Sequence, residues 1–386
     1  MIRLSPLKAL FTAQFLSAFV DNMILFIALG IIKRDAYPDY YLPFVQSIFL
    51  SSYIVFSPWV GRFADKKPKA KVLIIGNMVK TIGVLMLLCS FDPALSYGAV
   101  GVGAVIYSPA KYGILPFLTR NDDELLRANS GLEGYTIVAI LLGSVVGGIL
   151  SDFSITLALL ISLLLYGLSI GINSMIPHDP GNRSITYKSS IRDFFADLRV
   201  LLANSQSHYS LIGTGSFWLA SAVLRMILFA WAPLTLGITS GTSISMIIAV
   251  TGVGIAVGAV VTPYLISIKT YQRTLWFGYV MALCILAFLM IHTLEVAVIF
   301  LLLIGVMGGI YIVPMNSCLQ QVGQHTVGEG KTIAVQNFVE NLFMFFGVGL
   351  YTLATKNGVT IHSAIGATGV TLLLLVSYMY LYSRRK

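Results

Sequence analysis

The residues of this 386-residue chain that are best placed to do chemistry are four charged side chains inside long apolar stretches. Asp21 lies about 14 residues into the stretch 7–32, and Arg225 has a similar place in the stretch 209–236. Lys111 and Glu340 each lie about eight residues from one end of their stretches, which is ~12 Å along a helix. A charge at the centre of a bilayer costs at least ~2.5–3.5 kcal/mol, so such residues face a partner, a cavity or a proton.

These four residues form two candidate pairs of opposite charge. Asp21 and Arg225 occupy equivalent places in the two halves of the chain, and Lys111 can meet Glu340 at a similar depth. One interpretation is that both are ion pairs that only fix helix packing. Buried ion pairs often add little stability over apolar residues, so we favour a role in substrate binding or gating. Lys80 is expected nearer the cytoplasmic surface, where its long side chain can reach water.

Two prolines stand close to these polar positions. Pro109, two residues before Lys111, lacks a backbone donor and leaves a carbonyl one turn earlier without its helical partner. Pro314 holds the matching place in the second half. A kink beside an intramembrane lysine predicts a hinge, and the alternative is a purely structural bend.

Two further polar side chains, together with Glu340, complete the predicted site. Gln336 and Glu340 are four residues apart, so they share one face of a helix. Asn316, which follows Pro314, adds an amide. Together they offer polar groups to a ligand head group.

The composition indicates the element that must position these residues, the transmembrane helix. The chain is 57% hydrophobic and 11% charged, whereas soluble domains carry about 25% charged residues. About 20 apolar residues span a bilayer, and twelve stretches are long enough. We place them at 7–32, 43–64, 72–90, 94–118, 130–151, 155–176, 209–236, 243–268, 273–292, 294–320, 332–355 and 360–383.

The predicted architecture is an all-α membrane protein of two six-helix bundles, residues 1–176 and 209–386. The connection 177–208 carries an amphipathic segment that we expect to lie on the membrane surface as a helix. Ser190 and Asp193 have the spacing of a capping box at its start. The halves also repeat at an offset near 205: Ser17–Asp21 matches Ser221–Arg225, and Gly103 with Pro109 matches Gly308 with Pro314.

The basic residues set the orientation. The net charge is +9, and with the N-terminus inside, 19 of the 25 Lys and Arg residues fall in cytoplasmic segments against three outside. Both termini are therefore expected in the cytoplasm. This distribution also explains the positive charge without a nucleic-acid partner.

The chain lacks the patterns of an enzyme or a metalloprotein. It has no nucleophile–base arrangement, phosphate loop or metal-ligand spacing, and Cys89, Cys284 and Cys318 are isolated in apolar stretches. We therefore expect no catalytic residues, no metal and no cofactor.

The loop after the second stretch resembles the signature loop of the major facilitator superfamily. It begins Gly61-Arg62-Phe63-Ala64-Asp65 and continues with basic residues. The resemblance implies that Gly61 permits close helix packing. It also implies that Asp65 pairs with or caps a neighbouring helix while the outer gate is closed. The loop 263–273 of the second half has no such aspartate.

A closer resemblance is to the bacterial lysophospholipid transporter family, LplT, within that superfamily. Segments spread over nearly the whole chain carry it: AQFLSAFVDN, VGVGAVIYSPAKYGIL, ILLGSVVGGIL, LIGVMGGIYIVP and AVQNFVEN. The family implies inward flipping of lysophospholipids, chiefly lysophosphatidylethanolamine, across the bacterial inner membrane. It also implies re-acylation by an acyltransferase/acyl-carrier-protein synthetase on the cytoplasmic side. The residues that carry over as functional are Asp21, Lys111, Arg225 and Glu340.

The superfamily signature alone also permits another function, a proton-coupled facilitator of a soluble solute or drug. An acid paired with Lys or Arg is held ionised, which favours a gradient-independent cycle over proton carriage.

Overall fold

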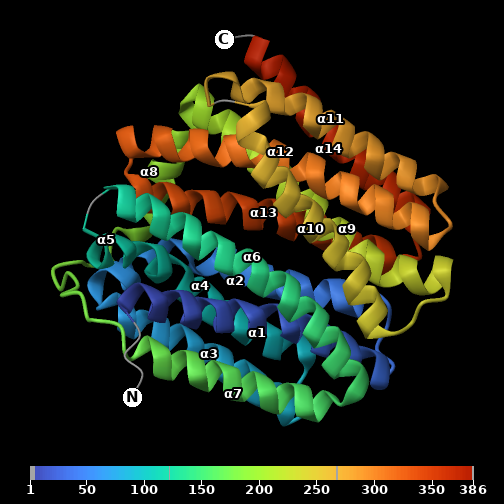
Figure 1. Ribbon diagram of the computed structural model, residues 1–386, viewed down its shortest axis with the longest axis horizontal. Helices are drawn as coiled ribbons and strands as arrows, with labels where there is room; N and C mark the ends of the chain where they lie inside the picture. The colour runs from blue at the N-terminus through green and yellow to red at the C-terminus, as the bar shows by residue number, and fades with distance from the viewer. Residues whose placement is uncertain (1–4, 121, 267, 385–386) are drawn as a thin grey trace. The chain divides into compact units, whose positions relative to one another are not determined.

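The computed structural model describes residues 5–120, 122–266 and 268–384, and the regular elements in them are helices (Figure 1). In the first half they are α1 (Pro6–Arg34), α2 (Tyr41–Lys66), α3 (Lys69–Leu88), α4 (Pro93–Gly113), α5 (Leu115–Leu118), α6 (Asp122–Phe153), α7 (Ile155–Asn173) and α8 (Ser190–Ala203). In the second half they are α9 (Ser205–Leu236), α10 (Gly241–Leu265), η1 (Ile268–Arg273), α11 (Thr274–Ala287), η2 (Phe288–Met290), α12 (Leu294–His325), α13 (Glu329–Lys356) and α14 (Ile361–Arg384).

Each of the twelve predicted stretches contains a helix, which confirms the all-α membrane fold. In the described part of the chain, eleven helices are long and apolar enough to cross a membrane. The twelfth expected stretch, 94–118, holds α4 and the short α5. Helix α4 falls short of the other spans in apolar character because Gly, Ser, Tyr and Pro residues interrupt its Val and Ala residues.

The chain divides into two compact units. The first unit is Met1–Ala36 with Ile48–Phe194, and the second is Tyr37–Ser47 with Phe195–Lys386. The first part of the connection predicted at 177–208 therefore packs with the first unit. The division falls inside α8, the helix predicted for the amphipathic segment.

In the first unit, α1 lies between α6 and α7 (Figure 1). Glycines bring α6 very close to α1. A Cβ atom at Gly143 would lie 2.2 Å from the Phe19 carbonyl oxygen, and one at Gly147 would lie 2.8 Å from the Met23 Cα. Small residues let helix backbones approach in this way, and dispersion contacts then hold the pair together in lipid.

The second unit uses the same device between α10 and α12. A Cβ atom at Gly258 would lie 2.2 Å from the Val306 carbonyl oxygen, and one at Gly305 would lie 2.2 Å from the Thr251 carbonyl oxygen. Helix α12 also packs on α9 and α11, and α9 packs on α13 and α14.

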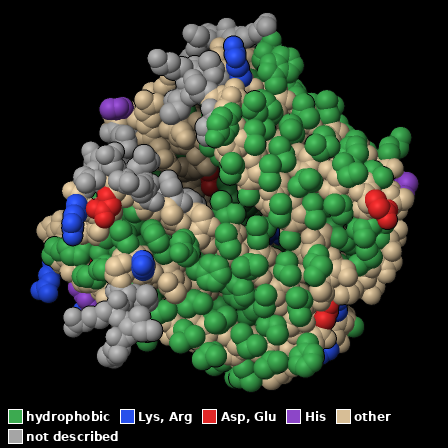
Figure 2. Space-filling model, viewed as in Figure 1, with side chains coloured by type: hydrophobic (Ala, Val, Ile, Leu, Met, Phe, Trp, Pro, Cys, Tyr) green, Lys and Arg blue, Asp and Glu red, His purple; other side chains and the backbone are tan. Residues whose placement is uncertain are grey.

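The helix surfaces expose large apolar side chains. Leu164 is 61% exposed, Trp276 69% and Leu374 66%. Apolar side chains cover most of the visible helix surface, and most of the charged ones lie toward its margins (Figure 2). An apolar surface of this kind is compatible with the hydrocarbon of a bilayer. Each helix also satisfies its own backbone hydrogen bonds there.

Candidate functional site

In the first unit, the intramembrane acid Asp21 forms an ion pair with Lys80. The Lys80 Nζ lies 2.7 Å from the Asp21 Oδ2, which joins α1 to α3. The Tyr166 hydroxyl on α7 donates to the other oxygen, Oδ1, at 2.6 Å. Three helices thus meet at one carboxylate, and each of its two oxygens accepts a hydrogen bond.

In this ion pair the cation is buried and the acid is partly exposed. The Lys80 side chain is only 1% exposed, whereas the Asp21 side chain is 19% exposed. The Lys80 ammonium also lies 4.8 Å from the centre of the Tyr107 ring, a cation–π contact that stabilises a desolvated charge. The expectation that Lys80 lies nearer the surface and reaches water is therefore wrong, because Asp21 compensates its charge inside the unit.

A chain of hydrogen bonds continues from this pair. Lys80 donates to the Ser17 hydroxyl at 2.9 Å, and Ser17 donates to the Asn77 carboxamide at 2.8 Å. Asn77 donates to Ser169 at 2.8 Å, and Ser169 donates to the Ala13 carbonyl at 2.8 Å. These side chains are buried, so the network fixes α1, α3 and α7 at one level.

Reasoning from the sequence missed Lys80 and Tyr166 as partners of Asp21. One signal was available, because Lys80 stands about 11 residues into α3 and Asp21 about 15 residues into α1, so both lie deep in their helices. Symmetry between the halves pointed instead to Arg225.

In the second unit, the structure brings together three of the predicted residues. Gln336 on α13 donates to the Asn316 carboxamide oxygen on α12 at 2.8 Å. It also donates to the Glu340 carboxylate at 2.8 Å, one helical turn along α13. Glu340 is 8% exposed, so this is a buried acid that accepts a hydrogen bond from a neutral amide.

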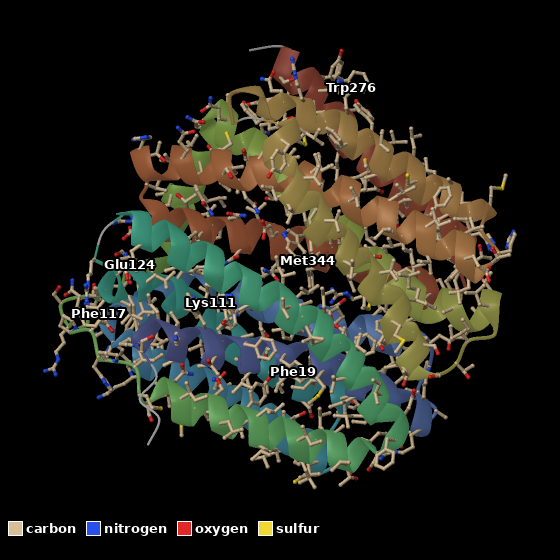
Figure 3. All side chains as sticks on the ribbon, in the orientation of Figure 1. Phe19, Lys111, Phe117, Glu124, Trp276 and Met344 are labelled. Atoms are coloured by element: carbon tan, nitrogen blue, oxygen red, sulfur yellow. The ribbon has the colours of Figure 1, made fainter. Side chains whose placement is uncertain are left out.

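The remaining predicted charges lie one in each unit. Lys111 is near the end of α4 (Figure 3). Its Nζ lies 4.7 Å from the centre of the Tyr112 ring. Arg225 is a half-buried residue of α9. The pairs Asp21–Arg225 and Lys111–Glu340 would each join the two units, and they stay predictions.

The two candidate hinges both lie inside helices. Helix α4 continues past Pro109 to Gly113, and the short α5 follows. Helix α12 continues past Pro314 to His325. Each proline therefore removes one backbone donor within a continuous helix, which is compatible with a bend there. The function of the two prolines as hinges stays a prediction.

The signature loop differs in detail from what its motif implies. A Cβ atom at Gly61 would meet nothing within 4 Å, so Gly61 is not a point of close packing. Asp65 is exposed, and within the first unit it is Asp179 that caps α3 by accepting from the Lys69 backbone N–H. The Lys69 ammonium also lies 3.0 Å from the Asp179 carboxylate.

The connection after α7 is fastened to this loop by further contacts, which we call the clasp. Arg62 donates to the Thr186 carbonyl at 2.6 Å and forms an ion pair with Asp193. The Ser189 hydroxyl, which hydrogen-bonds the Asp193 carboxylate, and the nearby Arg62 hold the pKa of that carboxyl below its usual range. The capping box predicted at Ser190 does not form, because within the described ranges the Ser190 hydroxyl has no hydrogen-bond partner.

No group of three or more His, Cys, Asp or Glu residues that could hold a metal ion occurs in the described ranges.

Comparisons with known proteins place this geometry in a wider group. A family model described as Major Facilitator Superfamily matches residues 10–348. The chain is 40% identical over 383 residues to the lysophospholipid transporter LplT of Enterobacter sp. (strain 638), covering 98% of this chain and 96% of the relative. It is 38% identical over 381 residues to the LplT of Photorhabdus laumondii, with the same coverage.

Solved structures share the fold at low sequence identity. A nucleoside transporter, NupG, superimposes with a TM-score of 0.73 at 14% identity, covering 99% of this chain and 100% of that one. A POT family transporter in complex with a thioalcohol-conjugated peptide superimposes with a TM-score of 0.78 at 11% identity, covering 98% and 96%.

Proposed function

Because the chain belongs to the LplT family within the Major Facilitator Superfamily, we propose that it transports lysophospholipids, chiefly lysophosphatidylethanolamine, from the outer to the inner leaflet of a bacterial inner membrane. The observation that carries this proposal is the 40% identity, along 98% of the chain, to a relative named as a lysophospholipid transporter. The partner on the cytoplasmic side is an acyltransferase/acyl-carrier-protein synthetase that re-acylates the product. The bias of basic residues supports an orientation with both termini in the cytoplasm.

The charged residues suit the two ends of a zwitterionic head group. A phosphate suits Arg225 or Lys111, since a guanidinium can bind two phosphate oxygens at once. The ethanolamine ammonium suits Asp21 or Glu340. The exposed edge of Asp21 and the amide cluster around Glu340 support these roles, because both present acceptors inside an apolar protein.

The acyl chain sets a different requirement, a path that keeps it in or near lipid. Each CH₂ moved from hydrocarbon to water costs about 0.8 kcal/mol, so a long tail does not cross through an aqueous cavity. We propose alternating access of the two six-helix bundles with lateral entry of the tail. Gln336 and Glu340 on α13 form a polar lip for the head group, with Asn316 beside them.

The conformational parts of this cycle are the signature loop and the two prolines. Asp65 is proposed to stabilise the state that is closed to the side opposite the cytoplasm, and its exposure leaves it accessible to a partner. Pro109 and Pro314 are proposed as the bending points of α4 and α12.

The test is transport by the purified protein in liposomes, with two labelled substrates. One is lysophosphatidylethanolamine, and the other is its deacylated, water-soluble head group, glycerophosphoethanolamine. We expect the lysolipid to cross and the head group to bind far more weakly. Replacement of Gln336 by Leu or of Glu340 by Ala should impair flipping while the protein stays folded.

A different result would support the alternative function. If the deacylated head group crosses as well as the lysolipid, lateral entry is wrong and a carrier of soluble solutes takes its place. Dependence of that transport on a proton gradient would then identify the proton-coupled facilitator.

A further inference from the structure

We propose that Lys80 and Tyr166 are positioning residues that hold the Asp21 carboxylate so that its exposed edge receives the ammonium of the substrate head group. This inference rests on the proposed function and adds two residues to the predicted site. The Lys80 ammonium and the Tyr166 hydroxyl bind different oxygens of the carboxylate, at 2.7 and 2.6 Å. Two contacts from two helices fix both the place of the carboxylate and the rotation of its plane.

The carboxylate has acceptor capacity beyond these two contacts. An ionised carboxylate offers about four lone-pair positions, and Lys80 and Tyr166 take one on each oxygen. Both donors are buried, since Tyr166 is 0% and Lys80 1% exposed, while the Asp21 side chain keeps 19% exposure. A ligand N–H that reaches the exposed part of Asp21 would therefore find acceptor positions that these two donors do not use.

Lys80 itself is held in place both at its ammonium and along its stem. Its ammonium donates to Ser17 at 2.9 Å and lies over the Tyr107 ring. Its stem lies against α4, where a Cβ atom at Gly103 would be 2.5 Å from the Lys80 Cγ. A cation confined in this way cannot follow a ligand, so it positions Asp21 and does not itself bind the head group.

The charges of the pair also determine what the exposed edge selects. Because Lys80 cancels the net charge of Asp21, the pair has no long-range attraction for cations. At hydrogen-bond distance the exposed negative end still favours a positive N–H donor over a neutral hydroxyl. The edge therefore discriminates a head group with an ammonium from one that ends in glycerol.

The competing interpretation is that Lys80 only neutralises Asp21 so that the unit folds. Asp21→Asn alone does not separate the two, because it leaves Lys80 buried without its counter-ion. The double variant Asp21→Asn with Lys80→Met removes both charges and leaves neither stranded. Tyr166→Phe removes one hydroxyl and keeps the ion pair. Tyr311→Phe in the second unit is its matched control, because Tyr311 is equally buried and its hydrogen bonds to described residues go to the neutral Ser216 and Met379.

The experiment measures KM and maximal flipping rate in liposomes for two lysolipids, one with an ethanolamine and one with a glycerol head group. We expect Tyr166→Phe to raise KM for the ethanolamine lysolipid by about tenfold, the loss of roughly one charge-assisted hydrogen bond. KM for the glycerol lysolipid should change less than about twofold, and Tyr311→Phe should change neither. The double variant should fold and lose the preference for ethanolamine.

Two outcomes would overturn the assignment. In one, the double variant keeps the wild-type preference. In the other, Tyr166→Phe slows both lysolipids equally with KM unchanged, as a structural defect does. If the wild-type protein flips neither lysolipid, the proposed function itself is wrong, which separates that failure from failure of the positioning role.

Discussion

The two units of this protein each hold an acid inside the membrane region, and a donor to each acid differs in charge between the units. In the first unit, Asp21 is paired with the buried cation Lys80. In the second unit, Glu340 accepts from the neutral amide of Gln336, which also bonds Asn316. The same contrast extends to their tyrosines, because Tyr166 donates to a carboxylate whereas Tyr311 bonds Ser216 at 2.9 Å.

The difference predicts how rigidly each unit holds its acid. A desolvated ion pair has one good geometry, and losing either partner leaves a charge in a medium that solvates it poorly. An amide cluster tolerates rearrangement, because an amide both donates and accepts. We therefore expect the first unit to present a fixed acid and the second an adaptable one.

The largest test of this contrast replaces the donor to each acid by methionine. Lys80→Met should lower the free energy of unfolding by about 3–5 kcal/mol, because it strands the Asp21 charge. Gln336→Met should cost only about 0.6–1.7 kcal/mol, the range of side-chain hydrogen bonds between membrane helices. Denaturant titration of the purified protein in detergent measures both.

The control for that test is Lys331→Met, which removes an ion pair with Asp197 from a lysine that is 61% exposed. An exposed pair of this kind contributes about 0–1 kcal/mol. Equal losses for Lys80→Met and Gln336→Met would contradict the contrast between the units.

A smaller test compares two equally buried tyrosines. Tyr166→Phe should cost about 1.5–3 kcal/mol, because the lost hydroxyl donates to a charged group. Tyr311→Phe should cost about 0.6 kcal/mol, because both of its partners are neutral. The same unfolding titration gives the two values, and a reversed order would show that the charge of Asp21 does not govern the first unit.

The smallest effect is expected at the clasp. Arg62→Gln breaks the ion pair with Asp193, whose side chain is 40% exposed, so water and salt already screen it. The thermal midpoint should hardly move, and whatever difference exists should shrink further in high salt. A large loss at any salt concentration would mean that the connection after α7 is a structural part of the first unit.

The sequence predicts the helices well and the charge pairing poorly, for physical reasons. Apolar stretches of about 20 residues need a helix in lipid, so every predicted stretch contains one. Gln336 and Glu340 meet because four residues make one turn, a local rule. Lys80 and Asp21 are 59 residues apart. Which face of α3 turns toward Asp21 depends on how α3 packs on α4 at Gly103 and on other contacts along the unit.

The signature loop shows the same limit. Its motif predicts a close approach at Gly61 and a capping role for Asp65, yet Gly61 faces open space and Asp179 caps α3. Asp179 is 110 residues from Lys69, so no local pattern identifies it.

The close packing of α6 against α1 at two glycines limits the leakage of ions through the protein. Gly143 and Gly147 bring α6 against α1 at Phe19 and Met23, one on each side of Asp21. Neither an acyl chain nor a file of water molecules fits where two backbones are this close. The close packing therefore leaves no route for ions along that edge of α1, and a lipid head group that binds Asp21, as proposed, would have to approach from the side of α1 that α6 does not cover.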